Sequence, residues 1–166
     1  MKTSLRELIY RSYGGRTRVR VNALLLEAGR LLLVEHRSFQ EPATTYWIPP
    51  GGGVQFGESI PEALQREVRE ETGLEVSLGP LVYVSDFLRG ELHAVELYFL
   101  AHITGGDLRT GQDPELGTEQ MICQVAWMSL EDLHRHRVYP VFLARELPRD
   151  VSEGFRAGAR YIGPIR

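Results

Sequence analysis

The chain has 166 residues, of which 43% are hydrophobic and 25% charged, as in an ordinary globular domain with a sizeable core. Its formal net charge of -3 argues against a protein that holds nucleic acid through a broad basic surface. We therefore expect a single domain over residues 1–166, do not expect nucleic acid as a partner, and leave a homodimer open.

Cysteine usage and the N-terminus indicate the compartment. Cys123 is the single cysteine, so an internal disulfide is excluded and a reducing compartment is expected. It lies in the apolar run 121–127, which favours a packed core thiol over a nucleophile. The first residues lack the apolar run of a signal peptide, and no apolar stretch is long enough to span a bilayer. These features predict a cytoplasmic protein without membrane contact.

The first third of the chain predicts an arm followed by a hairpin. Residues 1–16 form a short N-terminal arm or helix that ends at a pair of glycines and can dock on the core. Residues 16–27 and 31–35 are alternating or apolar and flank a glycine-containing turn, which predicts two antiparallel strands. The polar stretch 38–46 is then expected to be a loop.

The next segment contains a helix with clear ends. Ser59 is a favourable N-cap, and Glu62 completes a capping box. Pro61 lies in the first turn, where a backbone N–H is not needed. Gly73 suits the left-handed conformation that commonly follows a helix. Between these ends the apolar residues recur at helical spacing: Ile60, Ala63, Leu64 and Val68.

Several carboxylates lie along the edge of this apolar face. At about 100° per residue, Glu67 and Glu71 project beside the apolar stripe and Glu70 lies just beyond it. Like charges at this spacing repel by about 0.2–0.5 kcal/mol per pair, and burying an unpaired charge costs more. A divalent cation would relieve both effects, and Gly51 and Gly52 have no side chain to keep backbone groups away from it. The other interpretation is a solvated charged face neutralised by neighbouring arginines.

A fixed pattern, G-x5-E-x7-R-E-U-x-E-E-x-G-U with U a bulky aliphatic residue, runs through this segment. Its positions are filled by Gly52, Glu58, Arg66, Glu67, Val68, Glu70, Glu71, Gly73 and Leu74. The pattern resembles the signature of the Nudix hydrolase family, and its many fixed positions make it specific. The resemblance implies an α/β fold, a Nudix-type α/β/α sandwich with a mixed β-sheet.

The second half of the chain is expected to supply further strands and a second helix. Strands are predicted over 74–86, 91–104 and 121–128. A helix is predicted from Ser129 toward Pro140, with a last helical piece over 141–147. The stretch 105–120 is a long loop of the kind that is often functional or mobile. The C-terminal tail, 152–166, is expected to be ordered only by contact with another surface.

The resemblance implies hydrolysis of a phosphoanhydride in a nucleoside diphosphate linked to some group X. Mg²⁺ or Mn²⁺ is implied as cofactor, with Glu67 and Glu71 as first-choice ligands, Glu70 as ligand or base, and the Gly51 carbonyl as a further ligand. Arg66 is expected to position the carboxylates. A non-catalytic nucleotide-binding module of the same fold is the main alternative, and a diphosphate isomerase is a second.

Contacts with the substrate are less sharply indicated. Gly51 and Gly52 can approach phosphate closely, and His36 and Arg37 precede the 38–46 loop, where they can meet phosphate or base. The general base outside the signature is expected among three acids, in order of preference Glu119, Glu115 and Glu96. Stacking candidates for a nucleobase are Tyr46, Trp47, Phe87 and Tyr98. X remains open between a nucleoside triphosphate, a nucleotide sugar and a dinucleotide.

Overall fold

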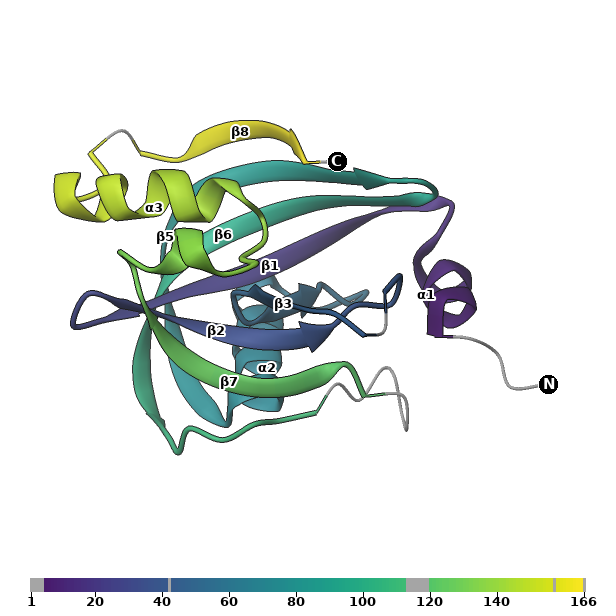
Figure 1. The fold of residues 1–166 in the computed structure, drawn as a ribbon, viewed down its shortest axis with the longest axis horizontal. Coiled ribbons are helices and arrows are strands. Elements are labelled where there is room, and N and C mark those ends of the chain that lie inside the picture. Colours follow the sequence, from purple (N-terminus) through teal and green to yellow (C-terminus); the bar gives the residue numbers. More distant parts are fainter. Residues whose placement is uncertain (1–4, 42, 113–119, 157, 166) are drawn as a thin grey trace.

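The computed structural model describes residues 5–41, 43–112, 120–156 and 158–165 (Figure 1). The helices are α1 (Leu5–Tyr13), α2 (Ile60–Thr72) and α3 (Phe142–Glu153), with a 3-10 turn, η2 (Leu133–Arg135). The strands are β1 (Arg16–Glu27), β2 (Arg30–Arg37), β3 (Thr45–Ile48), β4 (Gly51–Gly53), β5 (Leu74–Arg89), β6 (Leu92–Gly106), β7 (Ile122–Ser129) and β8 (Arg160–Ile165). None of the helices in these ranges is both long and apolar enough to cross a bilayer.

These strands pair into a mixed sheet. Its main path runs β3-β2-β1-β6-β5-β8, with β4 on β1 and β7 on β2. The first two strands form the predicted antiparallel hairpin, whereas β1 pairs in parallel with β6 and β5 with β8. The mixed sheet implied by the sequence is therefore confirmed, and strand β1, at its centre, brings β4 and β6 together.

Helices cover both faces of the sheet. Side chains alternate along β1, so Leu24 packs against Leu143 of α3 while Ala23 and Leu25 pack against Leu64 of α2. Figure 1 shows α3 in front of the sheet and the fainter α2 behind it, with α1 at one side. The expected α/β/α sandwich is confirmed, and the two helices pack in separate core clusters on opposite faces of the sheet.

Helix α2 begins and ends where its sequence predicts. The backbone N–H and the hydroxyl of Ser59 donate to the Glu62 carboxylate at 2.8 and 2.6 Å. Gly73 adopts φ 74° and donates its N–H to the Arg69 carbonyl at 3.0 Å, which closes the last turn. The ends of the helix are thus defined, and its buried residues Ala63, Leu64 and Val68 determine which side faces the sheet and where its acids point.

The helix expected from Ser129 toward Pro140 is wrong. Only η2 forms there, and α3 follows it and is longer than the helical piece predicted over 141–147. The chain is extended before Pro140 because the Trp47 N–H donates to the Arg137 carbonyl and the Tyr139 N–H donates to the Trp47 carbonyl, both at 2.8 Å. Proline also disfavours helical backbone in the residue before it.

The C-terminal tail adds a strand to the sheet of its own chain. β8 pairs in parallel with β5, so the tail does not wait for another molecule's surface. The Tyr83 hydroxyl donates to Asp150 Oδ2 at 2.5 Å, and the Arg160 guanidinium contacts the same carboxylate. The buried Asp150 therefore joins α3, β5 and β8.

The position of Cys123 differs from the expectation of a packed core thiol. Its side chain is exposed. β7 pairs with β2 on one side only, so it is an edge strand of the described sheet, and its first residues are open to solvent. The apolar run 121–127 therefore predicted more burial than this edge strand has.

Candidate active site

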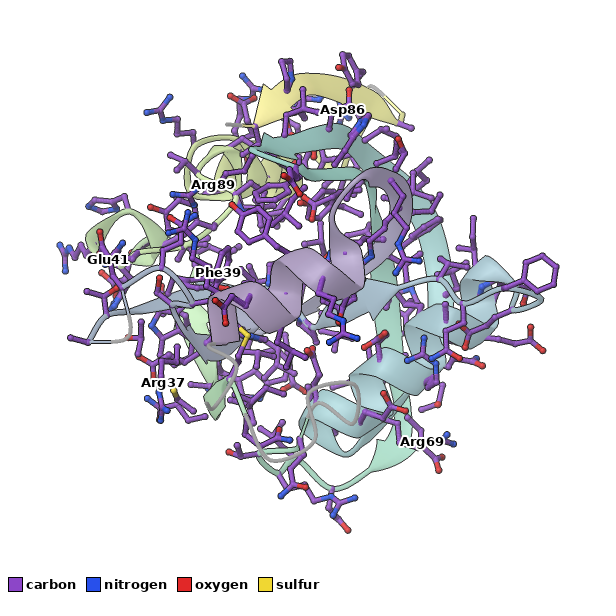
Figure 2. All side chains as sticks on the ribbon, turned by 90° about the vertical axis from the view of Figure 1, so that its right-hand side faces the viewer. Arg37, Phe39, Glu41, Arg69, Asp86 and Arg89 are labelled. Carbon is purple, nitrogen blue, oxygen red and sulfur yellow. The ribbon has the colours of Figure 1, made fainter. Side chains whose placement is uncertain are left out.

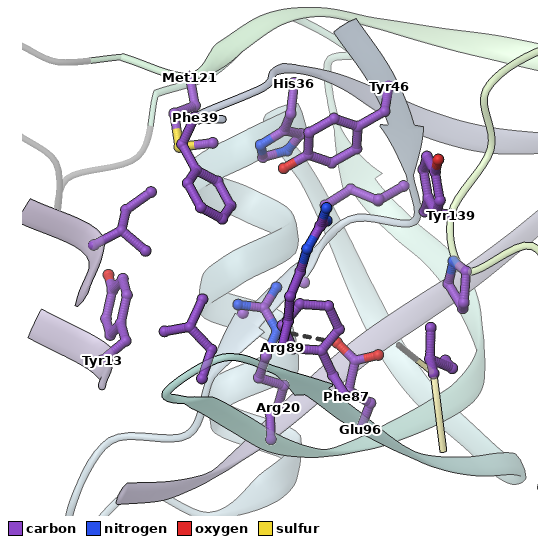
Figure 3. Close-up of a pocket in the computed structure, with 18 of the residues that line it drawn as sticks. Tyr13, Arg20, His36, Phe39, Tyr46, Phe87, Arg89, Glu96, Met121 and Tyr139 are labelled. Atoms are coloured by element: carbon purple, nitrogen blue, oxygen red, sulfur yellow. Dashed lines mark ion pairs between the residues drawn. The ribbon is translucent and has the colours of Figure 1, made fainter. Parts of the chain in front are cut away.

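A cavity of about 310 Å³ opens between α1, α2, β4 and the β5–β6 hairpin (Figure 3). Charged side chains of both signs line it: Arg18, Arg20, Arg89, Arg137, Glu41, Glu67, Glu71 and Glu96. The strand β4 forms one wall. Aromatic rings form much of the rest, from Tyr13, Phe39, Tyr46, Phe87 and Tyr139. A cavity of this volume and lining suits a small anionic molecule with a flat ring.

Two glutamates of α2 reach the cavity from the buried face of the helix. Glu67 is 9% exposed and Glu71 4%. The Gly51 N–H donates to Glu71 Oε2 at 2.9 Å, which fixes that carboxylate against β4. A Cβ on Gly52 would lie 2.2 Å from the Glu67 carboxyl carbon, closer than any real contact. The absence of a side chain at Gly52 is therefore what lets Glu67 lie against the strand.

Arg66 connects the other acids of the signature. Its Nε donates to Glu58 at 2.8 Å, and its Nη1 donates to Glu67 and Glu70 at 2.8 and 3.2 Å. Its Nη2 donates to the Gly53 carbonyl at 3.0 Å. Arg66 does not line the cavity. It contacts carboxylates and backbone, the geometry of a residue that positions them.

The carboxylates of α2 are the type of ligand that a hard divalent cation prefers. Glu67 and Glu71 line one cavity, and the missing Cβ of Gly52 leaves room for the Glu67 carboxylate against β4. Within the described ranges, no three acidic, histidine or cysteine side chains are already gathered into a cage. Glu70 is held by Arg66 and is 26% exposed at its side chain, so it has to turn to join the other two.

Glu96, the third-choice base, lies in the cavity, while Glu115 and Glu119 lie outside the described residues. Glu96 Oε1 is 3.4 Å from Arg20 Nε, and its Oε2 accepts from the Tyr98 hydroxyl at 2.6 Å. Both oxygens thus already have partners, and Glu96 holds Arg20 in the cavity wall.

His36 and Arg37 separate although they are adjacent in sequence. His36 is 7% exposed, lines the cavity and stacks on Tyr46, with ring centroids 5.9 Å apart. Arg37 is exposed and points away from the cavity (Figure 2), because neighbouring side chains of a strand face opposite ways. Of the two predicted substrate contacts, the structure brings only His36 to the site.

The His36 ring is neutral at pH 7. Burial, with the nearby charge of Arg20, lowers its pKa to about 4. The separation of 3.8 Å between His36 Nε2 and Glu71 Oε1 is too long for a hydrogen bond and, with a neutral ring, is not a salt bridge. Nε2 is buried and has no hydrogen-bond partner among the described residues. It is a polar atom that a ligand can satisfy.

The predicted stacking residues divide between the site and the core. Tyr46 and Phe87 line the cavity, whereas Trp47 and Tyr98 pack in the core under α3. Sequence reasoning missed Tyr13 of α1, Arg89 and Tyr139, which come from three distant segments (Figure 3). No local pattern marks these residues. Their position depends on long-range pairing of strands.

Fold and site together define a class of protein: an α/β/α sandwich in which a capped helix presents buried carboxylates to a glycine strand. The family model described as NUDIX domain matches residues 16–146. The chain belongs to this family.

Curated relatives agree with this assignment, and a solved structure shares the fold. A protein of Bacillus subtilis (strain 168) named "Putative 8-oxo-dGTP diphosphatase" is 30% identical over 139 residues, which cover 84% of this chain and 79% of that protein. An "ADP-ribose pyrophosphatase" of Methanocaldococcus jannaschii is 32% identical over 97 residues, 57% of this chain and 56% of that protein. A NUDIX hydrolase structure from Nitrosomonas europaea superposes with TM-score 0.69 at 22% identity, covering 85% of this chain and 92% of that one. Across three curated relatives the chain spans only 23% to 56% of their length.

Proposed function

We propose that this protein is a metal-dependent pyrophosphohydrolase that cleaves a phosphoanhydride in a nucleoside diphosphate linked to X. The observation that carries the proposal is the pair of buried carboxylates, Glu67 and Glu71, facing one cavity beside a glycine strand and several arginines. Arg66 pairs with Glu67 from outside the cavity, and Glu67 and Glu71 also line the cavity, where a divalent cation can bind carboxylate oxygens. A phosphoanhydride together with a divalent cation matches this cavity in charge and in size.

Each residue has a distinct role in this proposal. Glu67, Glu71 and the Gly51 carbonyl would hold Mg²⁺ or Mn²⁺. When bound, such an ion neutralises phosphate oxygens and makes water more acidic near pH 7. Glu70 is the proposed base, because it is partly exposed and adjoins the other two acids.

The surrounding residues orient the substrate. Arg20, held by Glu96 at 3.4 Å, presents a positive charge to the phosphate chain. His36 Nε2 offers a neutral hydrogen-bonding atom next to Tyr46, whose ring can stack a base. These groups bind and align the substrate, and α1 packs against the β5–β6 hairpin at the edge of the cavity.

A nucleoside triphosphate is the form of X that we favour. The Bacillus subtilis relative, whose name specifies a deoxynucleoside triphosphate, covers 84% of this chain, against 57% for the archaeal protein named for ADP-ribose. Arginines from two different strands, Arg20 of β1 and Arg89 of β5, line the cavity and also suit a chain of several phosphates. Nucleotide sugars and dinucleotides form the comparison set.

A substrate panel tests the proposal. Oxidised and ordinary nucleoside triphosphates, ADP-ribose, nucleotide sugars and dinucleotides are each incubated with the protein, with and without Mg²⁺ or Mn²⁺, and products are identified by phosphorus NMR. We expect metal-dependent release of a nucleoside monophosphate. A protein that binds one of these compounds tightly and leaves all of them intact would be the non-catalytic binding module instead.

A further inference from the structure

Arg18 lies where the N-terminal helix, β1 and β4 meet. Its guanidinium carbon is 3.7 Å from the centroid of the Tyr13 ring of α1. On its other side, Nη2 lies so close to Gly53 that a Cβ there would be 2.6 Å away. Arg18, Tyr13 and Gly53 all line the cavity that contains Glu67. The guanidinium is thus held between an aromatic ring and a backbone strand at the edge of the acidic site.

This arrangement presents the guanidinium as a phosphate-binding group. Arg18 and Arg20 are two residues apart on β1, so both side chains leave the same face of the strand. The planar guanidinium matches phosphate oxygens in a bidentate way, and stacking on a ring fixes its plane without removing its charge. A stacked arginine therefore loses less side-chain freedom when it binds an anion.

Gly53 connects Arg18 to the acidic helix. The Gly53 carbonyl accepts from Arg66 Nη2 at 3.0 Å, and Arg66 in turn holds Glu67 at 2.8 Å. Phosphates bound beside Glu67 would consequently lie along the same strand that carries the Arg18 guanidinium. Gly53 is not a fixed position of the signature pattern.

We propose that Arg18 binds a phosphate group of the substrate and that Tyr13 is its positioning residue. The inference rests on the proposed function and extends it. Arg18 lies within residues 16–146, the part that matches the family model, whereas α1 (Leu5–Tyr13) precedes that part. Through Tyr13, the N-terminal helix then contributes to the affinity for the phosphate chain, although it supplies none of the proposed metal ligands.

The test uses imidodiphosphate, a non-hydrolysable analogue of pyrophosphate, titrated into the full-length protein by calorimetry at fixed Mg²⁺ and ionic strength. Replacing Arg18→Gln should raise the dissociation constant about tenfold, the typical effect of losing a charged hydrogen bond. Gly53→Ala should act similarly although Arg18 is retained, because the new Cβ displaces the guanidinium. Its φ angle is not positive, so alanine is sterically allowed at this position.

Two variants of Tyr13 isolate positioning from folding. Tyr13→Leu removes the ring and should weaken binding about threefold, while Tyr13→Phe keeps the ring and should remain near the wild type. With a substrate found in the panel, the Arg18 and Tyr13→Leu variants should raise KM and leave kcat unchanged. Arg69→Gln removes one exposed charge from the outer face of α2 (Figure 2) and should change neither quantity.

The outcomes separate this inference from the proposed function. If the wild type binds imidodiphosphate and cleaves a nucleotide, yet Arg18→Gln and Gly53→Ala bind as the wild type does, the role of Arg18 is overturned. If these two weaken binding and Tyr13→Leu does not, the role of Tyr13 is overturned. Should Arg18→Gln fail to fold by thermal denaturation, Gly53→Ala, which retains Arg18 and displaces its guanidinium, carries the test. A wild type that neither binds nor cleaves contradicts the proposed function itself.

Discussion

Gly52 and Glu67 share a space that admits only one of a Cβ or a carboxylate. The Cβ of any other residue at position 52 would lie 2.2 Å from the Glu67 carboxyl carbon. Glu67 cannot retreat easily, because Arg66 holds its Oε1 at 2.8 Å and its side chain is only 12% exposed. The geometry of the acid therefore depends on a residue that has no functional group.

Replacing Gly52→Ala should displace Glu67 and lower the metal-dependent turnover at least tenfold. Forcing extra atoms into a packed site typically destabilises a protein by about 1–3 kcal/mol, so the midpoint of thermal unfolding should fall as well. Gly53→Ala is compared for stability alone, because its Cβ meets the Arg18 guanidinium and should also weaken substrate binding. Equal turnover in Gly52→Ala and the wild type would show that the position of Glu67 is unimportant for the reaction.

Replacing Glu71→Gln should abolish turnover and leave the fold intact. The amide oxygen of glutamine can still accept the Gly51 N–H, which now reaches Glu71 Oε2 at 2.9 Å. Loss of the charge also relieves repulsion from Glu67, so without metal the variant should be as stable as the wild type or slightly more stable. Turnover is compared with that of Glu75→Gln, an exposed acid on β5. Near-native turnover in Glu71→Gln would remove Glu71 from the proposed metal ligands.

Replacing Arg66→Lys should destabilise the protein by about 2–4 kcal/mol although the charge is kept. A lysine ammonium cannot reproduce the fork that reaches Glu58, Glu67 and the Gly53 carbonyl at once. Urea unfolding monitored by tryptophan fluorescence measures the loss. A change below about 0.5 kcal/mol, the usual size for a surface substitution, would mean that the bridging contacts contribute little.

Asp150 should make stability depend on pH in the acid range. Burial disfavours the charged form of Asp150, but hydrogen bonds from Tyr83 and Arg149 and the charge of Arg160 outweigh it and lower the pKa. A carboxyl with a lowered folded-state pKa stabilises the fold above its unfolded-state value of 3.8, and this contribution is lost as pH falls through the folded-state pKa.

Urea unfolding of the wild type and Asp150→Asn between pH 6 and about pH 3 tests this dependence. The wild type should lose stability more steeply toward acid than the variant, because asparagine does not titrate. Glu153→Gln, an exposed acid on the same helix, should follow the wild type. Parallel curves for the wild type and Asp150→Asn would contradict the assigned linkage.

Local rules were enough to predict α2 and its acids. Ser59 and Gly73 determine the ends of the helix, and the helical period then fixes which side of it carries Glu67 and Glu71. The strands β1, β2, β5, β6 and β7 followed from their residue types for the same reason, whereas β3, β4 and β8 were not predicted. In these segments the nearest neighbours in sequence are also the ones that decide the conformation.

Long-range contacts account for what the sequence did not predict. The segment before Pro140 has helical propensity, yet it is extended because Trp47, far away in the chain, supplies its hydrogen-bond partners. Tyr13, Arg89 and Tyr139 likewise come from distant segments, and they line one cavity only after the strands have paired. A one-dimensional pattern contains no term for such encounters.

The contacts of Arg66 determine whether the protein needs a metal ion in order to fold. One guanidinium reaches Glu58, Glu67 and Glu70, so the chain carries its own counter-ion for most of the signature acids. A newly made molecule can therefore fold before it meets any divalent ion, unlike small domains that collapse only around their metal. A chelator should inactivate the protein reversibly without unfolding it. Activity should return when the ion is added back, with no refolding step.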